Sequence, residues 1–144
     1  MPKLAAFPKA WLDALCVDGS LTVAKWIDMA ATIGVDGLEF YSGFLELKDK
    51  TNWKTFRAMA EDRGLPIVMF CCSPDFTHPD ESFRARQIEL EKNWIDTAAA
   101  LGATFCRVLS GQRRPEVSRA GGLRFAAESL EACLPHAAER GITL

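Results

Sequence analysis

The chain has 144 residues, of which 49% are hydrophobic and 25% carry a charge. This composition is that of a soluble globular domain with a core of its own, and it excludes a largely disordered chain. The formal net charge of −2 gives no general attraction to phosphate backbones or anionic lipid, so we expect neither nucleic acid nor membrane as a partner. No apolar stretch is long enough for a signal peptide or a membrane span, so a cytoplasmic location is the default expectation.

A recurring pattern of helix end, glycine and apolar strand organises the chain. Its four glycines, Gly34, Gly64, Gly102 and Gly141, are separated by 30, 38 and 39 residues (64−34, 102−64 and 141−102). This spacing is about the length of a strand, a helix and two loops. The repeat therefore predicts an α/β fold with right-handed crossovers and a parallel sheet, either half of a closed barrel or a small open doubly wound sheet.

Taken in chain order, the predicted strands are short apolar runs between turn residues. They cover residues 3–7, 37–41, 66–72 and 104–109, and a fifth strand begins at residues 142–144. The run at 66–72 is continuously apolar, which is typical of a central parallel strand covered on both faces. Residues 10–19, after the first strand, predict a loop or a single helical turn.

Four helices are predicted between these strands from apolar residues at helical spacing. We expect Ser20 to cap the first and Thr51 or Asn52 to cap the second, while the third runs from about residue 80 to residue 101. The third helix has a predicted sheet-facing stripe of Leu90, Trp94, Thr97, Ala98 and Leu101. The corresponding stripe of the fourth helix is Leu123, Ala127, Leu130, Leu134 and Ala137. Pro135 is expected to bend the fourth helix or to end it one turn early.

The five cysteines are odd in number and show no C-x-x-C spacing; they are Cys16, Cys71, Cys72, Cys106 and Cys133. Three of them fall on predicted strands. This placement favours small buried side chains in a reducing compartment over disulfide bonds or metal ligands.

Two charged residues lie inside predicted strands at the same position of the repeat. Glu39 follows Gly34 by five residues, and Arg107 follows Gly102 by five (39−34 and 107−102). Alternate strands of a barrel contribute to a common interior layer, so we expect both side chains to point into the interior. One interpretation is a buried ion pair that neutralises two costly charges, and the other is contact with a polar substrate.

The loops after the carboxyl ends of the strands build the site in either architecture. His78 follows the third strand, and it is interpreted either as a loop residue that helps to start the next helix or as a catalytic or metal-binding residue. Ser110, Gln112 and Arg113 follow the fourth strand, where a solvated turn is the alternative to recognition of an anion or a hydroxyl group. No GxGxxG, Walker A or GxSxG motif is present, so nucleotide binding and serine hydrolysis have no support.

The segments GVDGLEFY, FCCSPDFTHPD and CRVLSGQRRP resemble the N-terminal half of the sugar phosphate isomerase/epimerase family, the xylose isomerase-like TIM barrels. The resemblance extends over nearly the whole chain. It implies a single partial domain over residues 1–144, in which parallel (β/α) repeats form the N-terminal half of a (β/α)₈ barrel. It also implies proton or hydride transfer between adjacent carbons of a sugar, sugar phosphate or keto sugar. The expected substrate-binding residues of this half are Glu39, His78, Arg107, Ser110, Gln112 and Arg113.

The resemblance further implies a divalent metal ion, Mn, Mg, Co or Zn, in the intact family member. This ion is held by carboxylates and a histidine and polarises the substrate oxygens while a paired carboxylate acts as base. The family's metal ligands come from strands five to eight, and the first, a Glu on strand five, falls just past Leu144. No metal ligand and no catalytic residue carries over, so we expect this chain alone to hold no metal.

Two alternatives remain open beside a sugar isomerase or epimerase. One is a noncatalytic half barrel that serves as a binding or assembly module. The other is a DNA repair enzyme similar to endonuclease IV, which the net charge of −2 and the lack of a Lys/Arg stripe make less favoured. Since such a barrel needs about 250 residues, we expect the chain to self-associate or to pair with the missing half.

Overall fold

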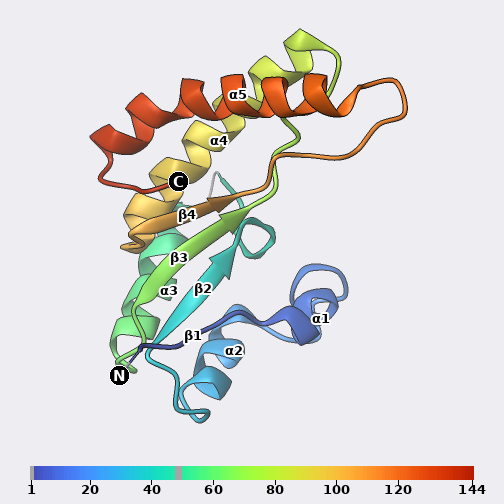
Figure 1. Ribbon diagram of the computed structural model, residues 1–144. Helices are drawn as coiled ribbons and strands as arrows, with labels where there is room; N and C mark the ends of the chain where they lie inside the picture. Colours follow the sequence, from blue (N-terminus) through green and yellow to red (C-terminus); the bar gives the residue numbers. More distant parts are fainter. Residues whose placement is uncertain (1, 48–49) are drawn as a thin grey trace.

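The computed structural model describes residues 2–47 and 50–144 and contains a four-stranded parallel sheet (Figure 1). The strands lie side by side in the order of the sequence, and their bounds are Ala5–Ala6 (β1), Gly37–Tyr41 (β2), Ile67–Cys72 (β3) and Phe105–Val108 (β4). Each connection between strands contains at least one helix. This arrangement confirms the predicted α/β fold of parallel repeats.

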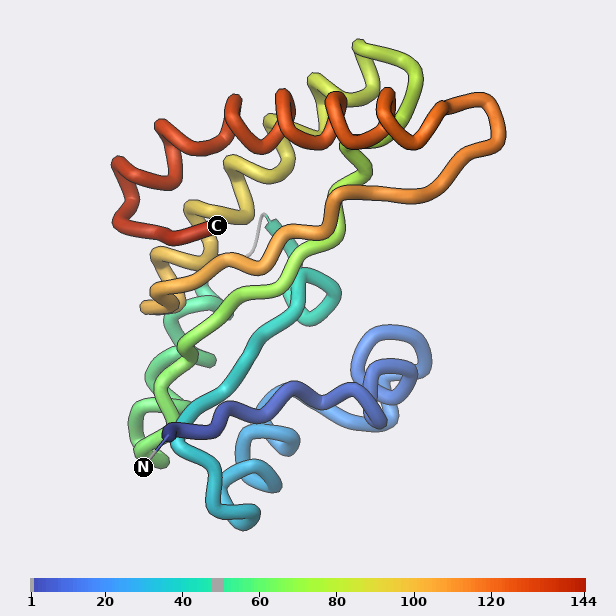
Figure 2. Tube along the Cα trace, viewed as in Figure 1, coloured from blue at the N-terminus to red at the C-terminus, as the bar shows by residue number. Residues whose placement is uncertain are grey.

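The helices lie behind and beside the sheet in Figures 1 and 2, and among the described residues none crosses its other face. Their bounds are Leu12–Cys16 (α1), Val23–Ala30 (α2), Lys50–Glu61 (α3), Glu81–Leu101 (α4) and Arg119–Glu139 (α5), with 3₁₀ turns at Lys9–Trp11 (η1) and Ser42–Phe44 (η2). Helices α3 and α4 pack on β3, and α5 packs on α4. We call the face without helices the inner face.

The core fills the space between the sheet and the helices. Leu38, Phe40 and Phe70 point to the helix side and are fully buried, as is Ile95 of α4. Full burial of such side chains contributes about 1.5–3 kcal/mol each. No helix within the described residues is both long enough and apolar enough to cross a membrane.

Two predicted helix caps are wrong. Thr22 rather than Ser20 caps α2, since the Thr22 hydroxyl accepts the Lys25 amide at 3.2 Å while the Ser20 amide is held by Asp18 in the preceding turn at 2.8 Å. Thr51 and Asn52 lie inside α3, so neither can be its cap.

The two long helices differ from their predicted stripes. On α4 the fully or nearly fully buried residues are Glu91, Ile95, Thr97, Ala98 and Leu101, while Leu90 and Trp94 are half-buried. On α5 they are Ala126, Ser129, Cys133 and Ala137, whereas Leu123, Ala127 and Leu134 are exposed. The small residues let α5 approach α4 closely, which a row of leucines would prevent.

Helix α5 continues through Pro135 to Glu139, so of the two predicted alternatives, a bend or an early end, the early end is wrong. Packing of α5 on α4 offsets the backbone hydrogen bond that proline cannot donate. The chain then turns back to the sheet. Thr143 forms a parallel bridge with Phe105, and the Cys106 amide donates to the Thr143 carbonyl at 2.8 Å, which confirms the start of a fifth strand beside β4.

Candidate functional site

Three polar side chains on neighbouring strands share the inner face. Glu39 pairs with Met69 and Arg107 pairs with Cys71, so alternation along the strands puts Glu39, Cys71 and Arg107 on the same side. The Cys71 thiol lies 3.8 Å from Glu39 Oε2, within the longer range of sulfur hydrogen bonds. Burial raises the pKa of this thiol, although the adjacent Arg107 guanidinium opposes the shift. Cys71 therefore separates the two charged groups and contacts both.

Glu39 and Arg107 do not neutralise each other. Neither makes an ion pair with any residue in the described ranges, which leaves a carboxylate and a guanidinium on the same open face. Glu39 and Arg107 also lie at different heights of the sheet, because Glu39 pairs with Met69 of β3 and Arg107 pairs with Cys71, two residues further along that strand. Of the two interpretations offered by the sequence, the buried ion pair is thus wrong.

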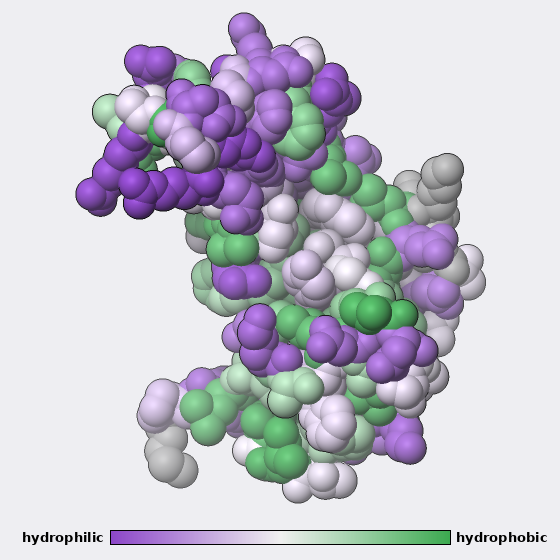
Figure 3. Space-filling view, turned by 90° about the vertical axis from the view of Figure 1, so that its right-hand side faces the viewer, coloured by the Kyte–Doolittle hydropathy of each residue, from purple (hydrophilic) through white to green (hydrophobic). Residues whose placement is uncertain are grey.

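Aromatic rings border these groups at the end of β1. The Arg107 guanidinium carbon lies 6.0 Å from the centre of the Phe7 ring, and Phe7 meets Tyr41 edge to face at 6.3 Å. The guanidinium thus extends across β3 and β2 toward the end of β1. Figure 3 shows the molecule hollowed on one side, with mainly hydrophilic residues above the hollow.

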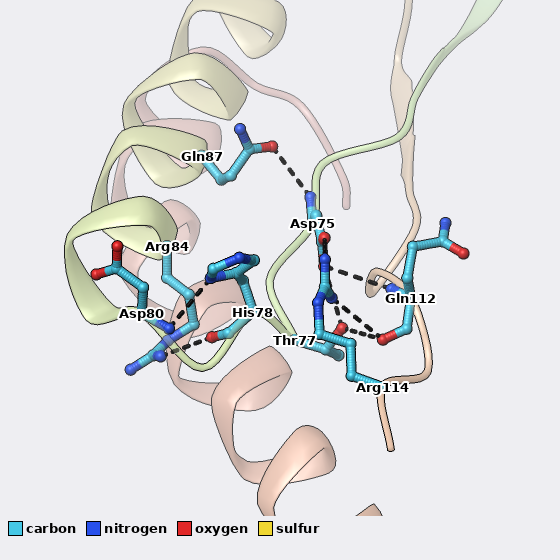
Figure 4. Close-up of polar contacts among 8 residues, drawn as sticks. All are labelled: Asp75, Thr77, His78, Asp80, Arg84, Gln87, Gln112 and Arg114. Carbon is cyan, nitrogen blue, oxygen red and sulfur yellow. Dashed lines mark hydrogen bonds and ion pairs between the residues drawn. The ribbon is translucent and has the colours of Figure 1, made fainter. Parts of the chain in front are cut away.

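The loops after β3 and β4 are fastened together by Asp75 (Figure 4). Arg114 donates to both carboxylate oxygens of Asp75, at 2.5 and 3.2 Å. Thr77 donates to Asp75 at 3.1 Å and to the Gln112 carbonyl at 2.6 Å, and the Gln112 amide donates to Asp75 at 3.4 Å. Burial alone raises the pKa of Asp75, but these hydrogen bonds outweigh it and hold the pKa below its usual value.

Gly111 is required where this loop meets Asp75. Its φ of +128° is open to glycine and strained for other residues. A Cβ at this position would lie 2.5 Å from Asp75 Oδ1 and 2.6 Å from Thr77 Oγ1. The chain can approach the carboxylate this closely only without a side chain.

A pocket of ≈ 730 Å³ opens between the β4–α5 loop and the beginning of α5. This volume lies in the range typical of sites for small molecules. The predicted residues Ser110, Gln112 and Arg113 line it, together with Arg119. Arg113 is exposed and makes no ion pair with a described residue, whereas its neighbour Arg114 is held by Asp75.

His78 lies apart from both places, at the beginning of α4 (Figure 4). Its ring stacks on Phe83 at 4.2 Å, and its Nδ1 accepts the Asp80 amide at 3.1 Å. Its carbonyl accepts a hydrogen bond from Arg84 at 2.8 Å. These contacts are those of a residue that helps to start the helix, which was one of the two interpretations of the sequence.

The six predicted site residues therefore fall into three groups. Glu39 and Arg107 lie on the inner face, the residues of the β4–α5 loop line the pocket, and His78 lies at the helix start. No role at the site was predicted for Cys71, Asp75 or Thr77. A signal for Asp75 was present, since it is an acidic residue in the loop that follows the central strand β3, and the next loop along the sheet carries the arginines.

The inner face offers few ligands to the divalent metal that the resemblance implies. Its described residues supply one carboxylate, Glu39, and the Cys71 thiol, and both histidines are engaged elsewhere, His78 with the Asp80 amide and His136 with Asp96 at 2.9 Å. A hard cation takes about six ligands, mostly oxygens. These residues alone do not fit such an ion, and no reaction step is assigned through one.

The fold and the rim of loops at the strand ends define a (β/α)-barrel protein. Residues 27–144 match the family model described as xylose isomerase-like TIM barrel, and the chain belongs to this family. No significant match to a curated protein sequence was found.

Solved structures with the same fold include several sugar epimerases. The chain is similar to a D-psicose 3-epimerase studied with D-fructose (TM-score 0.77, 19% identity, 87% of this chain and 46% of that one). It is also similar to a D-psicose 3-epimerase from Clostridium cellulolyticum H10 with D-tagatose (0.74, 16%, 83% and 44%) and to an L-ribulose 3-epimerase (0.75, 17%, 100% and 48%). The chain thus spans about half the length of these proteins.

Proposed function

We propose that this chain is the N-terminal part of an isomerase or epimerase of sugars or sugar phosphates, and that the substrate lies against the inner face. The observation that carries the proposal is the unneutralised pair of Glu39 and Arg107 on either side of Cys71. A carboxylate and a guanidinium that do not pair with each other can hydrogen-bond a polar ligand. The family membership and the epimerase fold support a sugar as that ligand.

Each group on the inner face has a role that suits a polyhydroxylated molecule. The Arg107 guanidinium only donates hydrogen bonds and suits hydroxyl or carbonyl oxygens, while the Glu39 carboxylate accepts from hydroxyl groups. Phe7 and Tyr41 provide an apolar surface for the carbon face of a sugar. These residues bind and orient the substrate. Proton or hydride transfer between adjacent carbons is assigned to groups outside this chain.

The pocket beside the β4–α5 loop suits an anionic end of the substrate. Arg113 and Arg119 line it with Ser110 and Gln112, and guanidinium groups bind phosphate in a bidentate manner. A sugar phosphate would use this pocket, and an unmodified ketose would leave it to water. Arg113 would therefore contact the phosphate group of a sugar phosphate but no part of an unmodified ketose.

The proposal is tested on the protein expressed from its whole gene. Epimerisation of D-fructose and D-tagatose is measured for the unmodified protein and for Arg107→Met and Glu39→Gln. We expect each variant to lose transition-state stabilisation of about 1.5–3 kcal/mol, the value for a charged hydrogen bond. Lys25→Met on the exposed side of α2 is the matched control, with unchanged kinetics.

Activity that is equal in all four proteins would mean that Glu39 and Arg107 do not contact the substrate. A gene that stops at codon 144, with a product that binds another chain and shows no turnover, would instead support the noncatalytic module.

A further inference from the structure

A second polar cluster lies on the opposite side of the sheet, between the strands and α4. The Cys72 thiol of β3 lies 3.1 Å from both carboxylate oxygens of Glu91, and the Cys106 thiol of β4 lies 3.6 Å from Oε1 of the same carboxylate. The two sulfurs are 3.5 Å apart. All three residues are buried, with Glu91 fully inaccessible.

The Glu91 carboxylate has no cation beside it. Within the described residues its hydrogen-bond partners are the two thiols, and no lysine, arginine or histidine pairs with it. Thiols are weak donors, and an unpaired buried carboxylate is costly. Burial raises the pKa of Glu91 accordingly, although the thiols oppose the shift. Three possible metal-ligand atoms thus converge at a buried position where no cationic side chain pairs with them.

We propose that Cys72, Glu91 and Cys106 bind one soft divalent cation of the Zn²⁺ class. Their ligand atoms all lie within 4.8 Å of one another. Usual Zn–S and Zn–O bond lengths give tetrahedral edges of roughly 3.8 Å between two sulfurs and roughly 3.6 Å between sulfur and oxygen. The Cys72–Cys106 and Cys106–Glu91 separations, 3.5 and 3.6 Å, come close to these values. The Cys72–Glu91 edge has to open by about half an ångström.

Cys133 of α5 is the candidate for a fourth ligand. Cys133 is fully buried, and the charge of Glu91 contributes, after burial, to raising the pKa of the Cys133 thiol to about 11. Its sulfur is not among the mutually close ligand atoms, so ligation by Cys133 would require the thiol to move toward the other three. The complete set would then join β3, β4, α4 and α5 through one ion.

Binding is an exchange of the metal ion for protons. Each cysteine releases its thiol proton and binds as thiolate, while Glu91 binds as carboxylate, so two protons leave per ion when Glu91 is ionised and Cys133 stays neutral. A third proton leaves when Cys133 also ligates. This site is structural and lies on the helix side, away from the proposed sugar site. It departs from the sequence-based expectation that the chain holds no metal by itself.

The test uses Co²⁺ alone as the probe, added while the full 144-residue chain refolds from urea under a phosphine reductant. Thiolate-bound tetrahedral Co²⁺ gives a sulfur-to-metal charge-transfer band and strong visible bands, neither of which an oxygen-ligated ion produces. We expect one Co²⁺ per chain with this spectrum, release of two or three protons, and displacement by Zn²⁺. Circular dichroism shows that each sample is folded.

Variants assign the ligands. Cys106→Ser and Glu91→Gln are expected to lower the affinity for Co²⁺ at least tenfold, and Cys106→Ser also weakens the charge-transfer band. Cys16→Ser removes an exposed thiol and leaves both unchanged. A folded unmodified chain without the charge-transfer band would overturn the proposal, as would a band that survives in folded Cys106→Ser and disappears in Cys16→Ser. Neither result bears on sugar turnover, so this test and that of the proposed function fail independently.

Discussion

Arg114 and Asp75, 39 residues apart in the sequence, form a two-point ion pair that joins the loops after β3 and β4. The pair is about four-fifths shielded from solvent on both sides, with exposed fractions of 22% and 19%. It fixes the position of the β4–α5 loop, and with it the pocket that Arg113 lines.

Loss of this carboxylate should destabilise the fold modestly. We expect Asp75→Asn to lower the free energy of unfolding by about 1–2 kcal/mol, in the lower part of the range for charged hydrogen bonds because solvent still screens the pair. Urea unfolding followed by circular dichroism measures this. Asp62→Asn, on an exposed turn, is the control and should be neutral. An equal effect of both substitutions would mean that the pair contributes nothing specific.

Acid should weaken the same contact. The pKa of Asp75 is held low by Arg114, Thr77 and Gln112 against the opposing effect of burial, and the pKa of Asp96 is held low by Arg140 and His136 in the same way. A carboxylate with a lowered folded-state pKa stabilises the protein above its unfolded pKa, about 3.9. That stability is lost as the pH falls through the lower folded-state pKa. We therefore expect unfolding free energy to fall below about pH 4.

The variant Asp75→Asn removes one of these titrating groups. Its unfolding free energy should fall less steeply below about pH 4 than that of the unmodified chain. Parallel pH profiles for the two proteins would contradict the assignment of this stabilisation to Asp75.

Substitution of alanine for two glycines near the pocket should change the stability of the fold in opposite directions. Gly111→Ala forces a strained φ and places a methyl group on Asp75 and Thr77, so it should cost about 1–3 kcal/mol of stability and loosen the loop. Gly122→Ala adds a methyl group inside α5 at ordinary contact distance, 3.8 Å from Thr77 and Val117. It should stabilise by about 0.5–1 kcal/mol. Thermal unfolding of both variants tests the geometry, and the same sign for both would refute it.

The open inner face makes self-association of the 144-residue chain a further prediction. Phe105 and Leu109 are 46% and 43% exposed, next to the sheet edge at Thr143. Exposed apolar groups beside an unpaired edge favour association. Light scattering should show dimers or larger species, and Phe105→Gln should shift them toward monomer. Leu134→Gln, on the outside of α5, should not change the distribution. A monomeric unmodified chain would contradict this prediction.

The repeat of strands and helices could be predicted because it is local. The glycines that end each helix and the continuous apolar run of β3 carry that information in a few neighbouring residues, and even the short pairing of Thr143 with β4 followed from it. The stripe of α5 could not be predicted this way. Its register depends on how closely small residues let α5 approach α4, which is a tertiary effect.

The candidate site was only partly predictable for the same reason. The repeat position of Glu39 and Arg107 indicated a shared face, and the register places both there. Sequence could not show that Asp75 would pair with Arg114 and leave Arg113 without an ion pair. Which of two adjacent arginines reaches the carboxylate depends on how the two loops fold. Glu91 was not part of the predicted stripe of α4, although it lies four residues before the buried Ile95 and is itself buried, because a charged residue is rarely expected on a buried helix face.

Solvent deuterium incorporation by the protein expressed from its whole gene tests directly whether this chain is part of a sugar isomerase or epimerase. Isomerisation or epimerisation by proton transfer exchanges the hydrogen of a carbon beside the carbonyl group with D₂O, so NMR of D-fructose or D-tagatose reports the reaction at the carbon where it occurs. We expect turnover of the sugar, with incorporation at such a carbon if a proton is transferred and without it if a hydride is transferred; the rate should be reduced in Arg107→Met and Glu39→Gln and unchanged in Lys25→Met. Turnover that is equally fast in all of these variants, or no turnover of either sugar or of its phosphate ester, would contradict the proposed function.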